Sequence, residues 1–148
     1  MIMADFKDFP RRGRILGVDW GARRTGIAVS DETRDFVFVR PAVVAGRGGD
    51  VARMVVDMAV AERVAGIVIG LPLRTDGTES ETTKMVRDFA SRVAEYTDLP
   101  ICLIDESLTS STAAEDAGLH SPKATKEHLD SESARIILEN AIAVIKRS

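Results

Sequence analysis

The chain has 148 residues, of which 45% are apolar and 29% are charged, a balance typical of one globular domain, so we expect residues 1–148 to form a single domain. One cysteine and two histidines exclude a disulfide framework and a Cys- or His-rich metal centre. The chain has no run of about 18 apolar residues and no apolar leader at its start, which excludes a membrane span and a signal peptide. These features favour a cytoplasmic protein with no membrane partner. The net charge of −3 argues against a nucleic-acid partner. However, residues 1–24 hold six basic and three acidic side chains. If acidic residues elsewhere bind a cation, the negative net charge no longer argues against a phosphate ligand.

The first half of the chain predicts three strands and a helix. The strands cover Arg14–Trp20, Thr25–Ser30 and Asp35–Val44. A turn at Gly21–Arg24 joins the first two strands as an antiparallel hairpin. Pro41 places the third strand near the edge of a sheet, where a residue without a backbone N–H is tolerated. Asp50 is a good N-cap for a helix over Val51–Val64, whose apolar residues fall on roughly one face.

The second half predicts two buried strands and three helices. The strands are the short apolar runs Gly66–Leu71 and Ile101–Ile104, and the first of them is typical of a strand buried on both faces. The helices run from a capping box formed by Thr78 and Glu81 to about Tyr96, from Thr109 to Glu115, and from Asp130 or Ser131 to Lys146. The polar segment Gly118–Leu129 is predicted to be irregular.

The order of these elements is β-β-β-α-β-α-β-α-α. A three-stranded antiparallel start followed by βαβ units predicts an α/β protein in which helices cover both faces of a mixed five-stranded sheet. This order is that of the ribonuclease H-like fold. It differs from a Rossmann domain, in which the first strand leads directly into a helix.

Acidic residues stand at the ends of three of these elements. Asp19 ends the first strand, the pair Asp105 and Glu106 follows the last strand, and Asp130 opens the last helix. Neighbouring side chains of a strand point to opposite faces, so only one of the pair shares the side of Asp19. Each acid also has an ordinary structural interpretation: Asp19 caps a turn, the pair is solvated or favoured by a helix dipole, and Asp130 is an N-cap.

Taken together, the three acidic positions predict a metal site. Parallel neighbouring strands present their carboxyl ends at one edge of the sheet, where ligands bind in open α/β folds. Oxygen ligands from three elements suit Mg²⁺ or Mn²⁺. Two such ions about 4 Å apart activate a water and stabilise the leaving oxygen of a phosphodiester.

Several residues near this edge suit contacts with nucleic acid. The loop after the strand Gly66–Leu71 offers Arg74, Thr75 and Thr78 to a phosphate. The basic residues that can contact a backbone are Arg11, Arg12, Arg14, Arg23, Arg24, Lys123 and Lys126. The nucleic-acid-binding set that we predict is Arg23, Arg24, Arg74, Thr75, Thr78, Thr109, Lys123 and Lys126. Trp20 is the one aromatic residue adjacent to the predicted site.

Four motifs resemble the YqgF family, also called RuvX. They are ILGVDWGARRTGIAVSD (Ile15–Asp31), IVIGLPLRTDGTES (Ile67–Ser80), IDESLTSSTAAE (Ile104–Glu115) and DSESARIILENAI (Asp130–Ile142). The resemblance covers about residues 14–146, with the motifs in order. Members are described as pre-16S rRNA nucleases or as Holliday junction resolvase-like proteins, and their fold is ribonuclease H-like and related to the RuvC resolvases.

The resemblance implies that Asp19, Glu106 and Asp130 are catalytic and bind the metal, and it favours Glu106 over Asp105. It implies a metal-dependent endonuclease that processes the 5′ end of precursor 16S rRNA. One alternative is a Holliday junction resolvase acting on branched DNA, which must be a stable dimer to cut two strands symmetrically. Another is an RNA-binding module without catalysis. The sequence leaves monomer and homodimer open.

Overall fold

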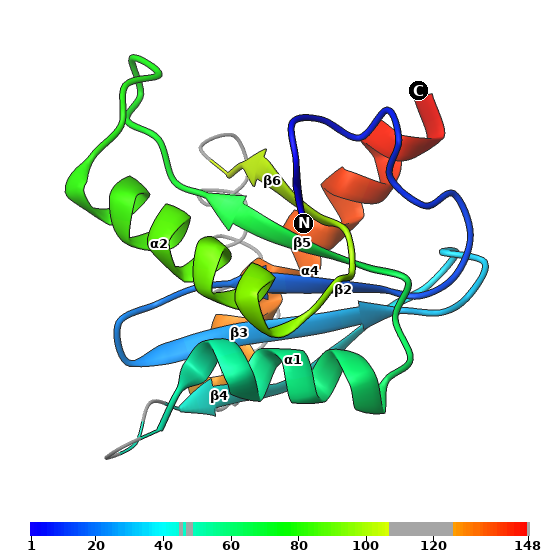
Figure 1. The fold of residues 1–148 in the computed structure, drawn as a ribbon, viewed down its shortest axis with the longest axis horizontal. Helices are drawn as coiled ribbons and strands as arrows, with labels where there is room; N and C mark the ends of the chain where they lie inside the picture. The colour runs from blue at the N-terminus through cyan, green and yellow to red at the C-terminus, as the bar shows by residue number, and fades with distance from the viewer. Residues whose placement is uncertain (45, 47–48, 107–125, 148) are drawn as a thin grey trace.

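The computed structural model describes the backbone of residues 1–44, 46, 49–106 and 126–147, and their side chains except at 126–130. The strands are β1 (Ile2–Met3), β2 (Ile15–Asp19), β3 (Arg24–Ser30), β4 (Val37–Val44), β5 (Gly66–Leu71) and β6 (Ile101–Asp105). The helices are α1 (Val51–Ala61), α2 (Glu81–Tyr96) and α4 (Lys126–Arg147) (Figure 1). The helix predicted from Thr109 to Glu115 lies outside the described residues.

The strands form one mixed sheet in the order β1-β6-β5-β2-β3-β4. Strands β2, β5 and β6 are parallel, whereas β3 pairs antiparallel with β2 and with β4. The sheet has six strands rather than the five predicted, because Ile2–Met3 pairs with Ile101–Cys102, and a two-residue strand is too short to show an apolar period. The predicted fold class is confirmed, and β4, which contains Pro41, is an edge strand.

Helices cover both faces of this sheet. Figure 1 shows α1 and α2 on one face and α4 on the other. Residues of β2 alternate between the two cores: Leu16 and Val18 belong to the core under α1 and α2, whereas Ile15 belongs to the core under α4. The single cysteine, Cys102, is buried in the α4 core. None of the described helices combines the length and apolarity that crossing a lipid bilayer requires.

Two features hold α4 close to the sheet. A Cβ atom on Gly17 would lie 2.7 Å from Cβ of Leu138, so only glycine lets the helix approach β2 this closely. The fully buried Ser131 accepts a hydrogen bond from the N–H of Ile27 at 3.3 Å and donates one to the carbonyl of Arg40 at 2.6 Å. This bridge stands where the register between β3 and β4 shifts, so it satisfies backbone groups beside the irregularity and anchors the helix.

The starts of two helices differ from the prediction. The capping box of α2 is formed by Ser80 and Thr83 rather than by Thr78 and Glu81. Thr78 is engaged elsewhere, because its hydroxyl and its N–H both donate to the carboxylate of Asp76. Helix α4 begins at Lys126, so the predicted start at Asp130 or Ser131 and the irregular assignment of residues 126–129 are wrong.

Candidate active site at the carboxyl edge of the sheet

Two acidic side chains face α4 at the carboxyl edge of the parallel strands. On β2, Gly17 packs against α4, and strand alternation therefore directs Asp19 to the same face. On β6, Ile104 packs in the α4 core, so Glu106 follows on that face and Asp105 points to the other. The N–H of Glu106 donates to the carbonyl of Leu71 at 3.1 Å, which continues the pairing of β6 with β5. The structure thus brings together Asp19 and Glu106.

A glycine lies between the two carboxylates. The central strand β5 separates β2 from β6, and Gly70 stands next to Ile104 in the register. A Cβ atom on Gly70 would lie 2.8 Å from Oε2 of Glu106 and 2.5 Å from Cδ1 of Ile137 on α4. The absence of a side chain therefore makes the space in which the Glu106 carboxylate sits.

The Glu106 carboxyl has a perturbed affinity for its proton. Burial raises the pKa of Glu106 above its ordinary value, a hydrogen bond with the Asp19 side chain lowers it, and the nearby charge of Asp105 raises it again. The net direction is upward. Two carboxyl groups in direct contact, one of them largely out of water, favour either a shared proton or a bound cation.

The third predicted acid, Asp130, lies within α4 rather than at its start, because the helix begins four residues earlier at Lys126. This excludes the interpretation of Asp130 as an N-cap. Its side chain is outside the described ones. Among the described side chains, no group of three or more His, Cys, Asp or Glu residues is placed to hold a metal ion, so the described part of the candidate site is the pair Asp19 and Glu106.

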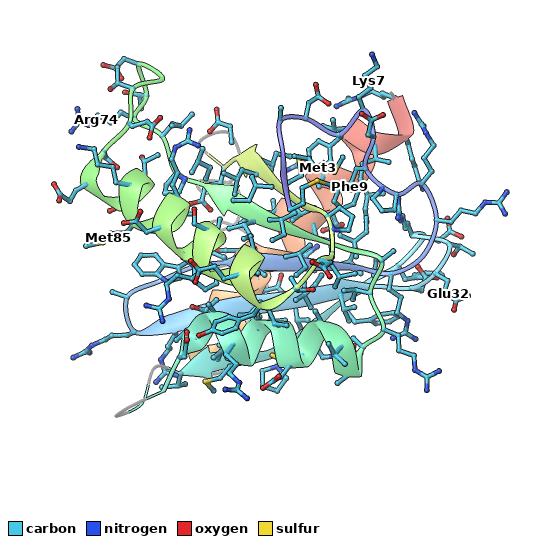
Figure 2. The ribbon with its side chains drawn as sticks, viewed as in Figure 1. Met3, Lys7, Phe9, Glu32, Arg74 and Met85 are labelled. Carbon is cyan, nitrogen blue, oxygen red and sulfur yellow. The ribbon has the colours of Figure 1, made fainter. Side chains whose placement is uncertain are left out.

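The loop after β5 leaves the sheet at the same edge. Arg74, Thr75 and Thr78 are exposed on it, and Figure 2 labels Arg74 on this loop, below its tip. The loop has internal order: the N–H of Arg74 donates to the carbonyl of Thr78 at 2.9 Å, and Leu73 forms a bridge with Glu79. No described contact joins these three residues to the carboxylate pair.

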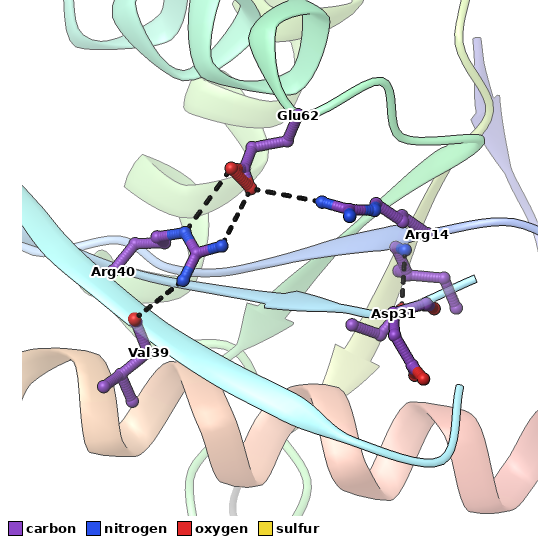
Figure 3. A network of polar contacts seen from close by, with 7 residues as sticks. Arg14, Asp31, Val39, Arg40 and Glu62 are labelled. Carbon is purple, nitrogen blue, oxygen red and sulfur yellow. Dashed lines mark hydrogen bonds and ion pairs between the residues drawn. The ribbon is translucent and has the colours of Figure 1, made fainter. Parts of the chain in front are cut away.

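The basic residues of the opening segment are divided between the two ends of β2. Arg23 lies in the turn after β2, and Arg24 is the first residue of β3, both at the end of β2 that carries Asp19. Arg11, Arg12 and Arg14 precede β2 and lie at the other end. The guanidinium of Arg14 is 3.9 Å from Glu62, whose carboxylate also pairs with Arg40 at 3.3 Å (Figure 3). This ion-pair network joins elements of the fold and holds Arg14 at the end of β2 away from the carboxylate pair.

Three further predicted contacts have no described side chain. Thr109 and Lys123 lie outside the described residues. Lys126 is the first residue of α4, and its side chain is also outside the described ones.

Gly70 is a residue of the site that was not predicted from the sequence. A glycine inside a buried strand often marks a close approach of another group, and Gly70 interrupts an otherwise branched run in β5. That signal was available, but it does not say which group approaches.

Comparison with known proteins identifies close relatives. The profile of the RuvX family, described as "Holliday junction resolvase", matches residues 13–143. A protein of Maridesulfovibrio salexigens is 41% identical over 88% of this chain and 98% of its own length. A protein of Rhodopirellula baltica is 37% identical over 89% of this chain and 78% of its own length. Both carry the name "Putative pre-16S rRNA nuclease".

Solved structures with the same fold are more distant in sequence. RuvC of Thermus thermophilus in complex with a Holliday junction substrate superposes with a TM-score of 0.59 at 11% identity, covering 91% of this chain and 97% of RuvC. The Holliday junction resolvase of fowlpox virus has a TM-score of 0.53 at 12% identity, covering 91% and 99%. These matches show the ribonuclease H-like fold, and the sequence profile with its relatives shows that the chain belongs to the RuvX family.

Proposed function

We propose that this protein is a nuclease that hydrolyses phosphodiester bonds in structured nucleic acid, with precursor 16S rRNA as its substrate. The observation that carries the proposal is the placement of Asp19 and Glu106 on one face of the sheet, in contact across Gly70. The names of the relatives from Maridesulfovibrio salexigens and Rhodopirellula baltica support the choice of substrate. Membership of the RuvX family supports the reaction class.

We infer that Asp19, Glu106 and Asp130 hold Mg²⁺ or Mn²⁺. The described pair fits such an ion, because carboxylate oxygens are the ligands that these cations prefer. Gly70 has no side chain, which leaves room for the Glu106 carboxylate beside it. Asp130 precedes Ala134 by four residues, and Ala134 is fully buried in the α4 core. The helical period places positions four apart on the same face, which supports Asp130 as the third ligand.

The chain's own groups have distinct tasks in the proposed reaction. A bound divalent ion supplies charge that activates water and stabilises the leaving oxygen. Glu106 must release its proton before it can bind a cation, and its raised pKa makes that release part of metal loading. Ile137 and Gly70 limit the positions open to the Glu106 carboxylate. Arg23, Arg24 and the exposed residues of the loop after β5 contact the phosphates.

The decisive test compares three conservative variants. Asp19→Asn and Glu106→Gln should each lower cleavage of precursor 16S rRNA in Mg²⁺ or Mn²⁺ by about a hundredfold or more, because each removes a charge that holds the ion. Asp105→Asn is the matched control: it is adjacent to Glu106 but lies on the other face, so it should retain most activity. EDTA should abolish cleavage by the wild-type protein. Full activity in a folded Asp19→Asn protein would show that Asp19 does not hold the ion. Absence of cleavage by the wild-type protein would leave an RNA-binding module without catalysis.

A DNA resolvase is the second candidate, and the family description and the fold of RuvC favour considering it. A four-way DNA junction offered in parallel with the RNA separates the two. Symmetrical cutting of the junction requires two active sites, so the mass of the protein in solution should be that of a dimer if this candidate holds. A monomer that cuts only the RNA supports the first proposal.

A further inference from the structure

A pocket of about 720 Å³ lies directly beyond the end of β2. The turn after β2 contributes Trp20, the start of α1 contributes Asp50, and α2 contributes Met85, Asp88, Phe89 and Arg92. Its size and its mixture of apolar walls with a few polar groups are those of a site for an organic ligand. The pocket is separate from the carboxylate pair, yet it begins one residue after Asp19.

Asp19 and Trp20 are consecutive residues whose side chains lie on opposite faces of the sheet. Asp19 faces α4, whereas Trp20 packs against the core under α1 and α2. The indole ring lies 6.4 Å from the ring of Phe89 at an interplanar angle of 39°, and Trp20 remains only partly buried. Asp19 and Trp20 are consecutive residues at the end of β2, so the pocket lies at the same edge of the sheet as the carboxylate pair, on the opposite face.

The walls of the pocket suit a flat, partly apolar ring with hydrogen-bond donors. Trp20 and the exposed Met85, whose side chain Figure 2 shows on α2, provide apolar surface. Asp88 is exposed and makes no hydrogen bond or ion pair within the described part of the chain. A free carboxylate accepts hydrogen bonds and repels phosphate.

Asp50 is engaged, in contrast to Asp88. Its carboxylate accepts from the N–H of Ala52 at 3.1 Å, from Arg92 at 3.0 Å and from the hydroxyl of Tyr96. Arg92 is therefore held at the rim of the pocket by an ion pair. The free carboxylate of Asp88 lines the pocket beside this ion pair and favours the N–H and NH₂ groups of a nucleobase over a second phosphate.

We propose that this pocket binds an unpaired nucleobase of the strand that is cut, next to the scissile phosphate, with the base stacked on Trp20. The proposal rests on the proposed nuclease function. A base within a duplex is stacked on both sides and has no free face for an indole ring, so the pocket selects a nucleotide that is single-stranded or turned out of the helix. The substrate class is thus nucleic acid that is unpaired beside the cleavage site.

The test uses the fact that Trp20 is the only tryptophan in the chain. A single-stranded oligoribonucleotide with a terminal dye is titrated into wild-type protein in EDTA, where it is not cut. Dye anisotropy reports binding, and tryptophan emission reports stacking. We expect saturable quenching of the emission with the Kd given by anisotropy, no quenching with the duplex of the same sequence, and loss of quenching when one particular nucleotide is made abasic.

Variants give an independent measurement. Trp20→Ala should raise the Kd for the single strand about tenfold or more, because stacking on an aromatic side chain contributes strongly to each bound base. Trp20→Phe should retain most of the affinity. Phe36→Ala is the matched control, since Phe36 is 65% exposed and lies in the turn between β3 and β4, at the other end of β3. Circular dichroism verifies that each variant is folded.

The outcomes separate the pocket from the nuclease. Binding without any change in tryptophan emission, or equal Kd values for wild type and folded Trp20→Ala, overturns the pocket whatever the cleavage assay shows. Quenching by the single strand together with no cleavage in Mg²⁺ or Mn²⁺ leaves the base pocket in place and removes the proposed nuclease function.

Discussion

At the scale of single residues, burial decides the protonation of Glu106, because the hydrogen bond with Asp19 shifts its pKa in the opposite direction. Its folded-state pKa is raised above the ordinary value of 4.5, first by burial. The folded protein therefore keeps this proton to a higher pH than the unfolded chain does. Through this group, the free energy of unfolding falls as the pH rises from about 4.5 through the raised pKa.

This coupling predicts the stability of a variant without metal. In EDTA at pH 7, Glu106→Gln should be more stable than wild type by about 1 kcal/mol, because it removes a half-buried charge that no cation balances. The gain should disappear below pH 4.5, where the wild-type carboxyl is protonated in both states. Urea unfolding at several pH values measures it. Glu95→Gln on the exposed face of α2 is the control, and an equal gain there would refute the explanation.

Gly70 and Gly17 permit a second comparison at this scale. Gly70→Ala places a methyl group 2.5 Å from Ile137 and 2.8 Å from Glu106, whereas Gly17→Ala places one against Leu138 only 2.7 Å away. Each should lower the free energy of unfolding by about 1–3 kcal/mol through overpacking. Gly70→Ala should also weaken Mn²⁺ binding, measured by calorimetry, because its methyl group meets the Glu106 carboxylate directly. Wild-type metal affinity in a folded Gly70→Ala protein would separate the Glu106 carboxylate from the metal site.

At the scale of elements, the position of α4 depends on the Ser131 bridge. Ser131→Ala leaves the N–H of Ile27 and the carbonyl of Arg40 without this partner. We expect a loss of about 1–3 kcal/mol in the free energy of unfolding and a lower cleavage rate, since Asp130 is the preceding residue. Ser91→Ala, at an exposed position of α2, should change neither quantity. A Ser131→Ala protein as stable as wild type would show that apolar packing alone places α4.

The elements also show which parts of the molecule were predictable from sequence. The strand β5 has the predicted bounds, Gly66–Leu71, because burial on both faces produces an unbroken apolar run. The start of α2 was misplaced, because Thr78 and Glu81 match the usual capping pattern, whereas Ser80 and Thr83 form the actual box. Strand β1 was missed because it exists only through its pairing with distant β6.

The candidate site was predictable only where a local property of the chain determines it. Alternation along a strand is a local property, so the sequence indicated that only one of Asp105 and Glu106 shares the face of Asp19. Which one does so depends on how β6 packs on α4, a tertiary fact. The group that approaches Gly70 and the walls of the Trp20 pocket come from elements that are far apart in the chain, so no local pattern identifies them.

At the scale of the whole molecule, the basic residues of the opening segment lie at two ends of the sheet. Arg23→Ala, in the turn next to Asp19, should weaken RNA binding and reduce the slope of log Kd against log salt by about 0.7–0.9, as expected for one lost phosphate contact. Arg12→Ala changes the net charge equally but lies at the other end of β2. It should leave the slope unchanged. Equal slopes for both variants would make Arg23 an ordinary surface residue.

The reactivity of the Cys102 thiol reports on opening of the whole fold. The thiol is buried between β6 and α4, and burial, together with the charge of Asp5, raises its pKa to about 11. Only the thiolate reacts with alkylating reagents, so labelling at neutral pH must await a fluctuation that lifts α4 from the sheet or unfolds the chain. The rate of modification of this one sulfur therefore measures how often the protein opens. A divalent ion that holds α4 on the strands should therefore lower the rate at which Cys102 is modified.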